Sequence, residues 1–173
     1  MNSMVLMVID MQNTLVESGP FNIENVVDNI SSLIKNARSQ GIEVIYIQHD
    51  DGVGSDLEDG TYGWEIYKTL LPHPDEKVFK KYYNSAFYKT DLHAYLQSKD
   101  IKTIVLTGMQ TEYCIDATLR SAFDLCYEIR IPENTNTTFD NEFLSGDKLF
   151  QYHNYKIWAN RFAKLIPVEE AFL

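Results

Sequence analysis

The sequence predicts a three-layer, doubly wound (Rossmann-like) α/β domain, with a mainly parallel sheet and helices on both faces. Three observations predict this fold class. Met4 to Ile9 form an unbroken apolar run, which is typical of a strand buried on both faces. Residues 23–39 carry apolar side chains at helical spacing, and Gly41 fits the helix end. A second apolar run follows over 42–47, and such a strand–helix–strand unit places its two strands parallel.

The remaining elements continue this alternation. Residues 49–63 are rich in acids and glycines without apolar periodicity, which predicts a loop. The expected strands cover 78–79, 103–107, 127–131 and, at an edge, 161–166. The expected helices cover 90–99, 112–126 and 141–159, with a polar loop over 134–140. Cys126 falls on the apolar stripe of the helix over 112–126, so we expect a buried, structural thiol there.

Length and composition limit the class of protein. A chain of 173 residues fits one domain, which we expect to cover 1–173. The apolar share of 45% excludes a disordered chain, and the net charge of −10 disfavours nucleic acid and membrane surfaces as partners. The first apolar run is too short to span a bilayer and lacks the basic flank of a signal peptide. We therefore expect a cytoplasmic protein with free thiols.

The ends of the predicted strands carry the candidate functional residues. In doubly wound sheets, sites lie outside the carboxyl ends of the strands. This rule selects Asp10, the residues from His49 to Asp51, Lys80 with Lys81, and the segment 108–114. Asp10 either caps the following turn or serves as a partly buried general base.

Cys114 follows a buried strand and a glycine turn, in Thr107-Gly-Met-Gln-Thr-Glu-Tyr-Cys114. If Thr111 is the N-cap, Cys114 lies in the first turn of a helix, where free N–H groups favour a thiolate and can hold an oxyanion. A nearby lysine would lower the thiol pKa further, and a carboxylate would accept the proton. The alternative is a buried structural cysteine. The position favours a nucleophile.

Three blocks of residues resemble a known superfamily, the isochorismatase-like cysteine hydrolases, which includes nicotinamidases, N-carbamoylsarcosine amidases and isochorismatases. The blocks are Val8-Ile-Asp-Met-Gln-Asn13, Lys81-Tyr-Tyr-Asn-Ser-Ala-Phe87 and Thr107-Gly-Met-Gln-Thr-Glu-Tyr-Cys-Ile115, with Thr118 and Ala122 after the third. Their order and spacing also fit, so the resemblance covers essentially the whole chain. It implies the isochorismatase-like hydrolase fold and homo-oligomers (dimers or tetramers), with residues 171–173 as a candidate apolar contact.

The resemblance also implies a mechanism. Cys114 would attack an amide-type carbonyl carbon and form a thioester, Asp10 would act as the base, and Lys81 would be the stabilising cation. A cis peptide is implied at Met109–Gln110, with the backbone N–H groups of Gln110 and Cys114 as the oxyanion hole. Spacing to the Ser-Ala-Phe triplet favours Lys81 over the neighbouring lysine.

Other residues near the motifs are candidates for contact with a small-molecule substrate. They are Gln12, Asn13, Trp64, Tyr83 and Tyr113. The three aromatic side chains can wall a pocket, or they can equally belong to the core or to a dimer surface.

The chain departs from the family pattern in its metal motif, at Leu15, where the family has Phe, and at Cys126. Nicotinamidases carry an Asp-x-His metal motif, whereas this chain has His49-Asp-Asp-Gly, with the wrong spacing. We therefore expect no metal and no cofactor. Cys126 replaces the usual glycine before the strand over 127–131.

Two alternatives remain open at this stage. True isochorismatases cleave a vinyl ether and do not need the cysteine as nucleophile, so Cys114 favours amide hydrolysis. The second alternative is a non-catalytic domain of the same fold that binds a small molecule or a partner. The presence of all three residues Asp10, Lys81 and Cys114 argues against it.

Overall fold

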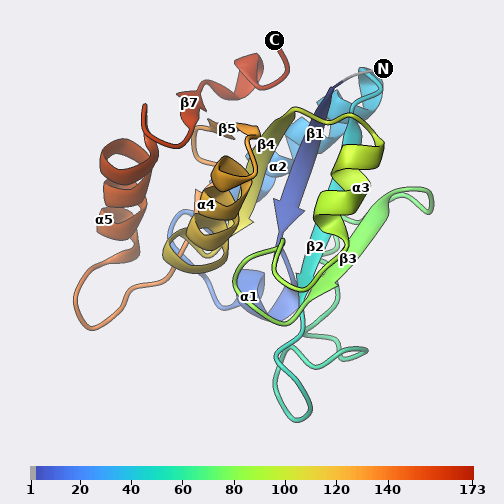
Figure 1. Ribbon diagram of the computed structural model, residues 1–173. Helices are drawn as coiled ribbons and strands as arrows, with labels where there is room; N and C mark the ends of the chain where they lie inside the picture. The colour runs from blue at the N-terminus through green and yellow to red at the C-terminus, as the bar shows by residue number, and fades with distance from the viewer. Residues whose placement is uncertain (1–2) are drawn as a thin grey trace.

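The fold is a seven-stranded sheet between two layers of helices, in a computed structural model that describes residues 3–173 (Figure 1). The strand order is β3-β2-β1-β4-β5-β7, with β6 paired to β4 beside this path. All the pairings between these strands are parallel. The strands are β1 (Met4–Ile9), β2 (Glu43–His49), β3 (Lys77–Lys81), β4 (Thr103–Met109), β5 (Glu128–Pro132), β6 (Asn136–Thr137) and β7 (Lys164–Ile166).

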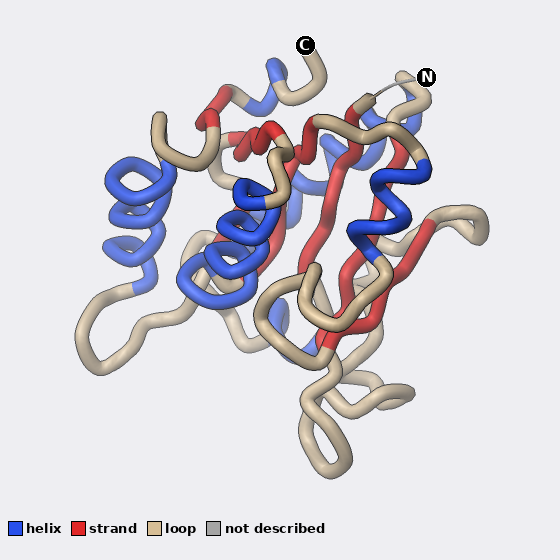
Figure 2. Tube along the Cα trace, in the orientation of Figure 1, coloured by secondary structure: helices blue, strands red, loops and turns tan. Residues whose placement is uncertain are grey.

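Helices cover both faces of the sheet, and Figure 2 shows the strands as one central layer between them. The α-helices are α1 (Asn13–Glu17), α2 (Ile23–Ser39), α3 (Leu92–Ser98), α4 (Asp116–Asp124) and α5 (Gly146–Gln151). Two π-helical segments, η1 (Thr111–Ile115) and η2 (Tyr152–Trp158), and a short 3-10 helix, η3 (Val168–Glu170), complete the set. In Figure 1, α2 lies behind the sheet and α3 and α4 lie in front of it.

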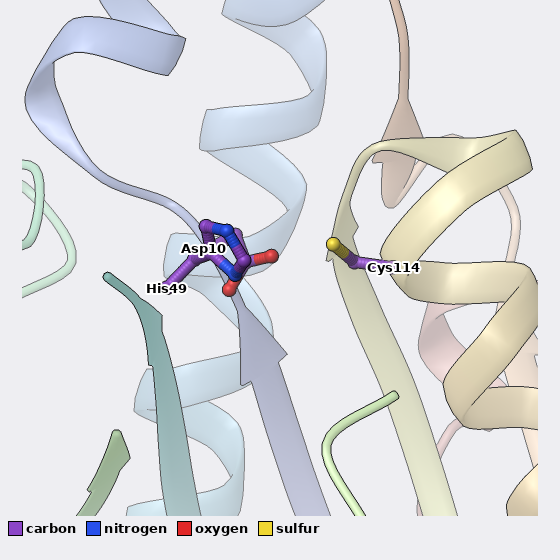
Figure 3. Close-up of side chains that lie close together, drawn as sticks. All are labelled: Asp10, His49 and Cys114. Atoms are coloured by element: carbon purple, nitrogen blue, oxygen red, sulfur yellow. The ribbon is translucent and has the colours of Figure 1, made fainter. Parts of the chain in front are cut away.

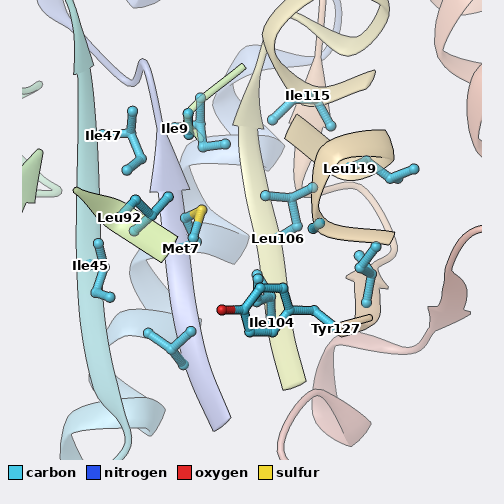
Figure 4. Close-up of a cluster of buried hydrophobic side chains, with 14 of the residues drawn as sticks. Met7, Ile9, Ile45, Ile47, Leu92, Ile104, Leu106, Ile115, Leu119 and Tyr127 are labelled. Carbon is cyan, nitrogen blue, oxygen red and sulfur yellow. The ribbon is translucent and has the colours of Figure 1, made fainter. Parts of the chain in front are cut away.

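The unbroken apolar run of β1 follows from burial on both faces. Met7 and Ile9 pack with α3 and α4 in one core cluster, which Figure 4 shows. Leu6 and Val8 point to the opposite face and pack against α2 in a second cluster. A strand buried on both sides has no solvent-facing positions for polar residues, so its sequence does not alternate.

Most predicted elements are confirmed, and the helix over 23–39 has the predicted bounds. The helix predicted over 141–159 is shorter, because α5 begins at Gly146 with Ser145 as its N-cap, and residues 152–158 are π-helical. The polar loop over 134–140 contains β6, and the edge strand β7 starts only at Lys164. Helix α1 was not predicted.

The expectation that Cys126 is buried is wrong, because this residue is exposed and lies beyond the end of α4. Its φ angle is +66°. The Cys126 N–H donates to the carbonyl of Phe123 and the Tyr127 N–H to that of Ala122, which is the Schellman pattern that ends a helix at a left-handed residue. This conformation explains why the family pattern has glycine here.

Within residues 3–173, every helix is too short or too polar to cross a membrane.

Candidate active site

The carboxyl ends of four parallel strands bring the predicted site residues together. Asp10 directly follows β1, and Ile9 at the end of that strand is paired with Gly108 of β4. His49 and Lys81 are the last residues of β2 and β3 and lie opposite each other in the ladder. Cys114 lies in η1, just after β4. Parallel pairing therefore places residues far apart in sequence at one edge of the sheet.

The side chain of Lys81 lies at the centre of this group and is inaccessible to solvent. Its Nζ is 2.8 Å from Asp10 Oδ2 and 3.2 Å from Cys114 Sγ. A third neighbour, His49 Nδ1, lies 2.9 Å away. Lys80 points elsewhere: it pairs with Asp59 and lies over a tryptophan ring. The geometry places Lys81, and not Lys80, beside the cysteine.

Asp10 has a conformation and an environment that suit a proton acceptor. It adopts a φ angle of +52°, and its N–H donates to the carbonyl of Ile47 at 3.0 Å. One carboxylate oxygen, Oδ2, is engaged by Lys81, whereas the buried Oδ1 has no hydrogen-bond partner among residues 3–173. The alternative that Asp10 caps the following turn is not observed, because the N-cap of α1 is Gln12.

The turn that carries the nucleophile is packed tightly against β1. Gly108 has a φ angle of +118°, and a Cβ at this position would lie 2.0 Å from the carbonyl oxygen of Ile9. The Met109–Gln110 peptide is cis. The carbonyl of Gln110 accepts the N–H groups of Tyr113 and Ile115.

The expected N-cap assignment is wrong by one residue. Gln110 is the N-cap of η1, and Thr111 is the first residue of this segment. The Thr111 hydroxyl donates to Asn136 Oδ1 at 2.8 Å instead of capping the helix. Cys114 nevertheless lies within the first turn, as the sequence predicts.

The expectation of a lowered thiol pKa at Cys114 is also corrected. Burial and the negative charge of Asp10 raise the pKa of the Cys114 thiol to about 12, although Lys81 acts in the opposite direction. Burial also lowers the pKa of Lys81, but Asp10 and Cys114 outweigh it, so that this pKa lies above its ordinary value. The resting site therefore holds a neutral thiol beside a carboxylate and an ammonium. Such an arrangement can deliver a thiolate when the thiol proton moves to a nearby base.

The family model for the isochorismatase domain matches residues 4–170. The chain belongs to the isochorismatase family of hydrolases. The uncharacterized isochorismatase family protein YddQ of Bacillus subtilis is 33% identical over 138 residues, which are 77% of each chain. The ureidoacrylate amidohydrolase RutB of an Enterobacter species is 26% identical over 196 residues, with 91% of this chain and 85% of that protein covered. A crystal structure of an isochorismatase family protein has a TM-score of 0.89 at 30% identity and covers 96% of this chain and 99% of its own.

One set of side chains in this isochorismatase-family protein has the composition of a metal site. Asp10, His49 and Cys114 each offer a ligand atom, and these atoms lie within 4.8 Å of one another. Figure 3 shows the Cys114 sulfur pointing from η1 toward the other two residues. The Lys81 ammonium, however, contacts all three. A metal cation bound here would face a fixed positive charge, so the residues do not fit a metal while Lys81 is protonated.

Gln12 and Asn13 belong to the scaffold of the site. The buried Gln12 side chain donates to the carbonyls of His49 and Trp64, each at 2.9 Å, and accepts the His49 N–H at 2.9 Å. Asn13 donates to the carbonyl of Tyr62 at 2.9 Å. These bonds fix the segment after β2 against the end of β1. A direct substrate contact by the Gln12 amide, as the sequence suggests, would require one of its bonds to break.

The three candidate aromatic residues lie in different surroundings. Trp64 lines a cavity of about 450 Å³ together with Gln48 and Lys80, and the triad residues are not part of its lining. Tyr83 is 45% exposed and Tyr113 is 50% exposed. The two tyrosines are therefore not core residues, and their contact with a substrate stays a prediction.

Sequence reasoning missed two features of the site. The strand-end rule selected His49, but the only role considered for it was that of a metal ligand, and its contact with Lys81 was not predicted. The second feature is a buried pair of side-chain amides: Asn136 Nδ2 donates to Asn154 Oδ1 at 2.9 Å, and Asn154 Nδ2 donates back to Asn136 Oδ1 at 3.0 Å. Through Thr111, this pair ties η1 to η2. Nothing in the local sequence marks it.

Proposed function

We propose that this protein is a cofactor-independent cysteine hydrolase that cleaves a C–N bond of a small amide-type substrate. One observation carries the proposal: the Lys81 ammonium bridges the Asp10 carboxylate and the Cys114 sulfur at 2.8 Å and 3.2 Å. A nucleophile, a base and a fixed cation are the groups that covalent acyl transfer requires. The name of the relative RutB, an amidohydrolase, supports C–N chemistry.

The first half of the reaction forms the thioester. Cys114 Sγ attacks the carbonyl carbon, and the thiol proton moves to Asp10. The oxyanion of the tetrahedral intermediate accepts hydrogen bonds from the backbone N–H groups of Gln110 and Cys114. Asp10 then gives its proton to the leaving nitrogen, and the C–N bond breaks to leave an acyl group on sulfur.

The second half regenerates the thiol. Water attacks the thioester carbon and gives a proton to Asp10. The C–S bond breaks, Asp10 returns the proton to sulfur, and a carboxylic acid leaves. Lys81 stays protonated throughout, because the positive charge stabilises the carboxylate and the developing thiolate in turn.

The high thiol pKa suits this sequence of steps. A thiol with a pKa of about 12 is neutral before the substrate binds, which protects it from other electrophiles. Attack then depends on a nearby base, and the buried Asp10 Oδ1 has its acceptor capacity free. The two features together favour base-assisted attack over a preformed thiolate.

Trapping the acyl-enzyme tests the proposal. The protein is mixed with a panel of small primary amides and N-carbamoyl compounds and quenched in acid, and its mass and peptide map are recorded. We expect an added acyl mass on the peptide that contains Cys114, together with release of the amine. Cys126→Ser is the matched control, because this thiol is exposed and distant from the site, and it should keep both signals.

Cys114→Ala should lose the adduct and the turnover while its circular dichroism spectrum stays unchanged. Turnover of an amide by Cys114→Ala would contradict the covalent mechanism. Turnover of a vinyl ether, without turnover of any amide, would assign vinyl-ether hydrolysis to this protein instead.

A further inference from the structure

Lys81 has a third neighbour that the proposed reaction does not use. A lysine ammonium has three N–H donors and no acceptor. Two of these donors face Asp10 Oδ2 and Cys114 Sγ, and the third faces His49 Nδ1 at 2.9 Å. Since Lys81 can only donate, Nδ1 must accept. His49 is therefore neutral, with its proton on Nε2.

The surroundings of the His49 ring agree with this tautomer. Nε2 lies 3.5 Å from the carboxylate of Asp51, which attracts an N–H there. The backbone of His49 is held on both sides, because the Gln12 amide accepts its N–H and donates to its carbonyl. The ring is only 15% exposed. The imidazole is thus fixed, and its one acceptor atom points at the ammonium.

We propose that His49 is a positioning residue of the catalytic centre, whose neutral imidazole holds the Lys81 ammonium in the orientation that serves Asp10 and Cys114. This inference deepens the proposed function and rests on it. With all three donors engaged, the ammonium has one orientation, and two of its N–H groups are directed at the reacting pair. Without the acceptor at His49, a buried N–H is left unpaired and the lysine is free to reorient.

The test compares His49→Asn with His49→Leu in a Cys126→Ser background. The two new side chains have nearly the same shape, but only asparagine offers an oxygen at the position of Nδ1. The first readout is the alkylation rate of Cys114 by iodoacetamide at a fixed mildly alkaline pH, which needs no substrate. The second readout is the ¹⁵N spectrum of the His49 ring. His93→Leu is the control, because His93 contacts Tyr127 on the α3 face, outside the site.

We expect a neutral Nε2–H ring in the wild-type protein. His49→Leu should slow alkylation about tenfold to a hundredfold, the scale of one charge-assisted hydrogen bond, whereas His49→Asn should stay within about threefold of the wild type. Where an amide substrate is available, kcat should follow the same order. His93→Leu should leave alkylation unchanged.

Three results would overturn the inference: a ring with its proton on Nδ1, equal impairment of two folded variants His49→Asn and His49→Leu, or no change in either variant. If His49→Leu fails to fold, the tautomer of the His49 ring in the wild-type protein, read from its ¹⁵N spectrum, tests the inference by itself. If alkylation behaves as expected but no amide is hydrolysed and no acyl adduct forms, the proposed function fails while the role of His49 stands.

Discussion

The Lys81 ammonium and the Asp10 carboxylate form an ion pair of 2.8 Å in which neither side chain is more than 2% exposed. Taking two charges out of water is costly, and their mutual attraction compensates only while both are present. Loss of either side chain would therefore leave the other as a buried, unpaired charge. The pair also sets the electrostatic environment of the neighbouring Cys114 thiol.

Asp10→Asn should make Cys114 more reactive toward alkylation while abolishing amide turnover. Burial and the Asp10 carboxylate together raise the pKa of the Cys114 thiol to about 12, whereas Lys81 lowers it. Without the negative charge, only burial opposes the lysine, so the alkylation profile between about pH 7 and about pH 11 should shift to lower pH. Peptide mass spectrometry follows Cys114 directly. A slower alkylation in the variant would contradict the assigned role of Asp10.

Lys81→Met should destabilise the fold by about 3–5 kcal/mol, because it leaves the Asp10 charge buried without its partner. Lys80→Met is the adjacent control, since the Lys80 side chain is 32% exposed and pairs with the exposed Asp59 and, only at 3.8 Å, with Asp50. It should change the unfolding free energy little. Urea unfolding at neutral pH measures both. Similar losses of unfolding free energy in the two variants would mean that Lys81 does not stabilise the fold through its buried ion pair.

Gly108→Ala should cost about 3 kcal/mol of unfolding free energy, since its Cβ would lie 2.0 Å from the Ile9 carbonyl oxygen at a φ angle of +118°. Gly54→Ala is matched for positive φ (+85°), but nothing lies within 4 Å of its Cβ. It should cost about 1 kcal/mol. The clash in Gly108→Ala also displaces the nucleophile turn, so amide turnover should fall about a hundredfold. Equal stability of the two variants in urea would refute the close approach.

Asn154→Leu should destabilise the protein by about 1–3 kcal/mol, because the buried Nδ2 of Asn136 loses its acceptor, Asn154 Oδ1, whereas Asn136 Oδ1 still accepts from Thr111. The double variant with Asn136→Leu should lose less than the sum of the two single changes. Gln151→Leu, on the same helical run but exposed, is the control. Additive losses in a double-mutant cycle would show that the two amides do not act as a pair.

Chelators should leave amide turnover unchanged. Asp10, His49 and Cys114 could hold a metal only after Lys81 had lost its proton or moved, because its ammonium contacts all three. Dialysis against EDTA followed by rate measurements checks this. Activity that is lost on dialysis and restored by zinc would assign a metal to the centre.

Much of this structure was readable from sequence because it depends on local pattern. The apolar run of β1 predicted a strand buried on both faces, and the two core clusters show why it does not alternate. Helix α2 has its predicted bounds because its buried positions repeat at helical spacing. The three motif blocks selected Asp10, Lys81 and Cys114 without coordinates, since each block lies at the end of a strand.

Other features were predicted wrongly because they depend on residues that are close in the folded structure but far apart in the sequence. Cys126 fits the apolar stripe of α4, but the chain turns back toward β5 and places it in a left-handed, exposed conformation. Thr111 has a good capping side chain, yet Asn136 of a distant segment engages it.

By itself, the sequence predicted most of the strands and helices from their periodicity, and its resemblance to the family selected Asp10, Lys81 and Cys114 as the candidate reactive groups. Only the tertiary structure decided how those groups interact. The raised pKa of the Cys114 thiol, the contact of His49 Nδ1 with Lys81 Nζ and the hydrogen bonds of the Gln12 side chain all depend on distances of a few ångströms between segments far apart in the chain. Electrostatic and hydrogen-bond energies change steeply over such distances, and no linear pattern encodes them.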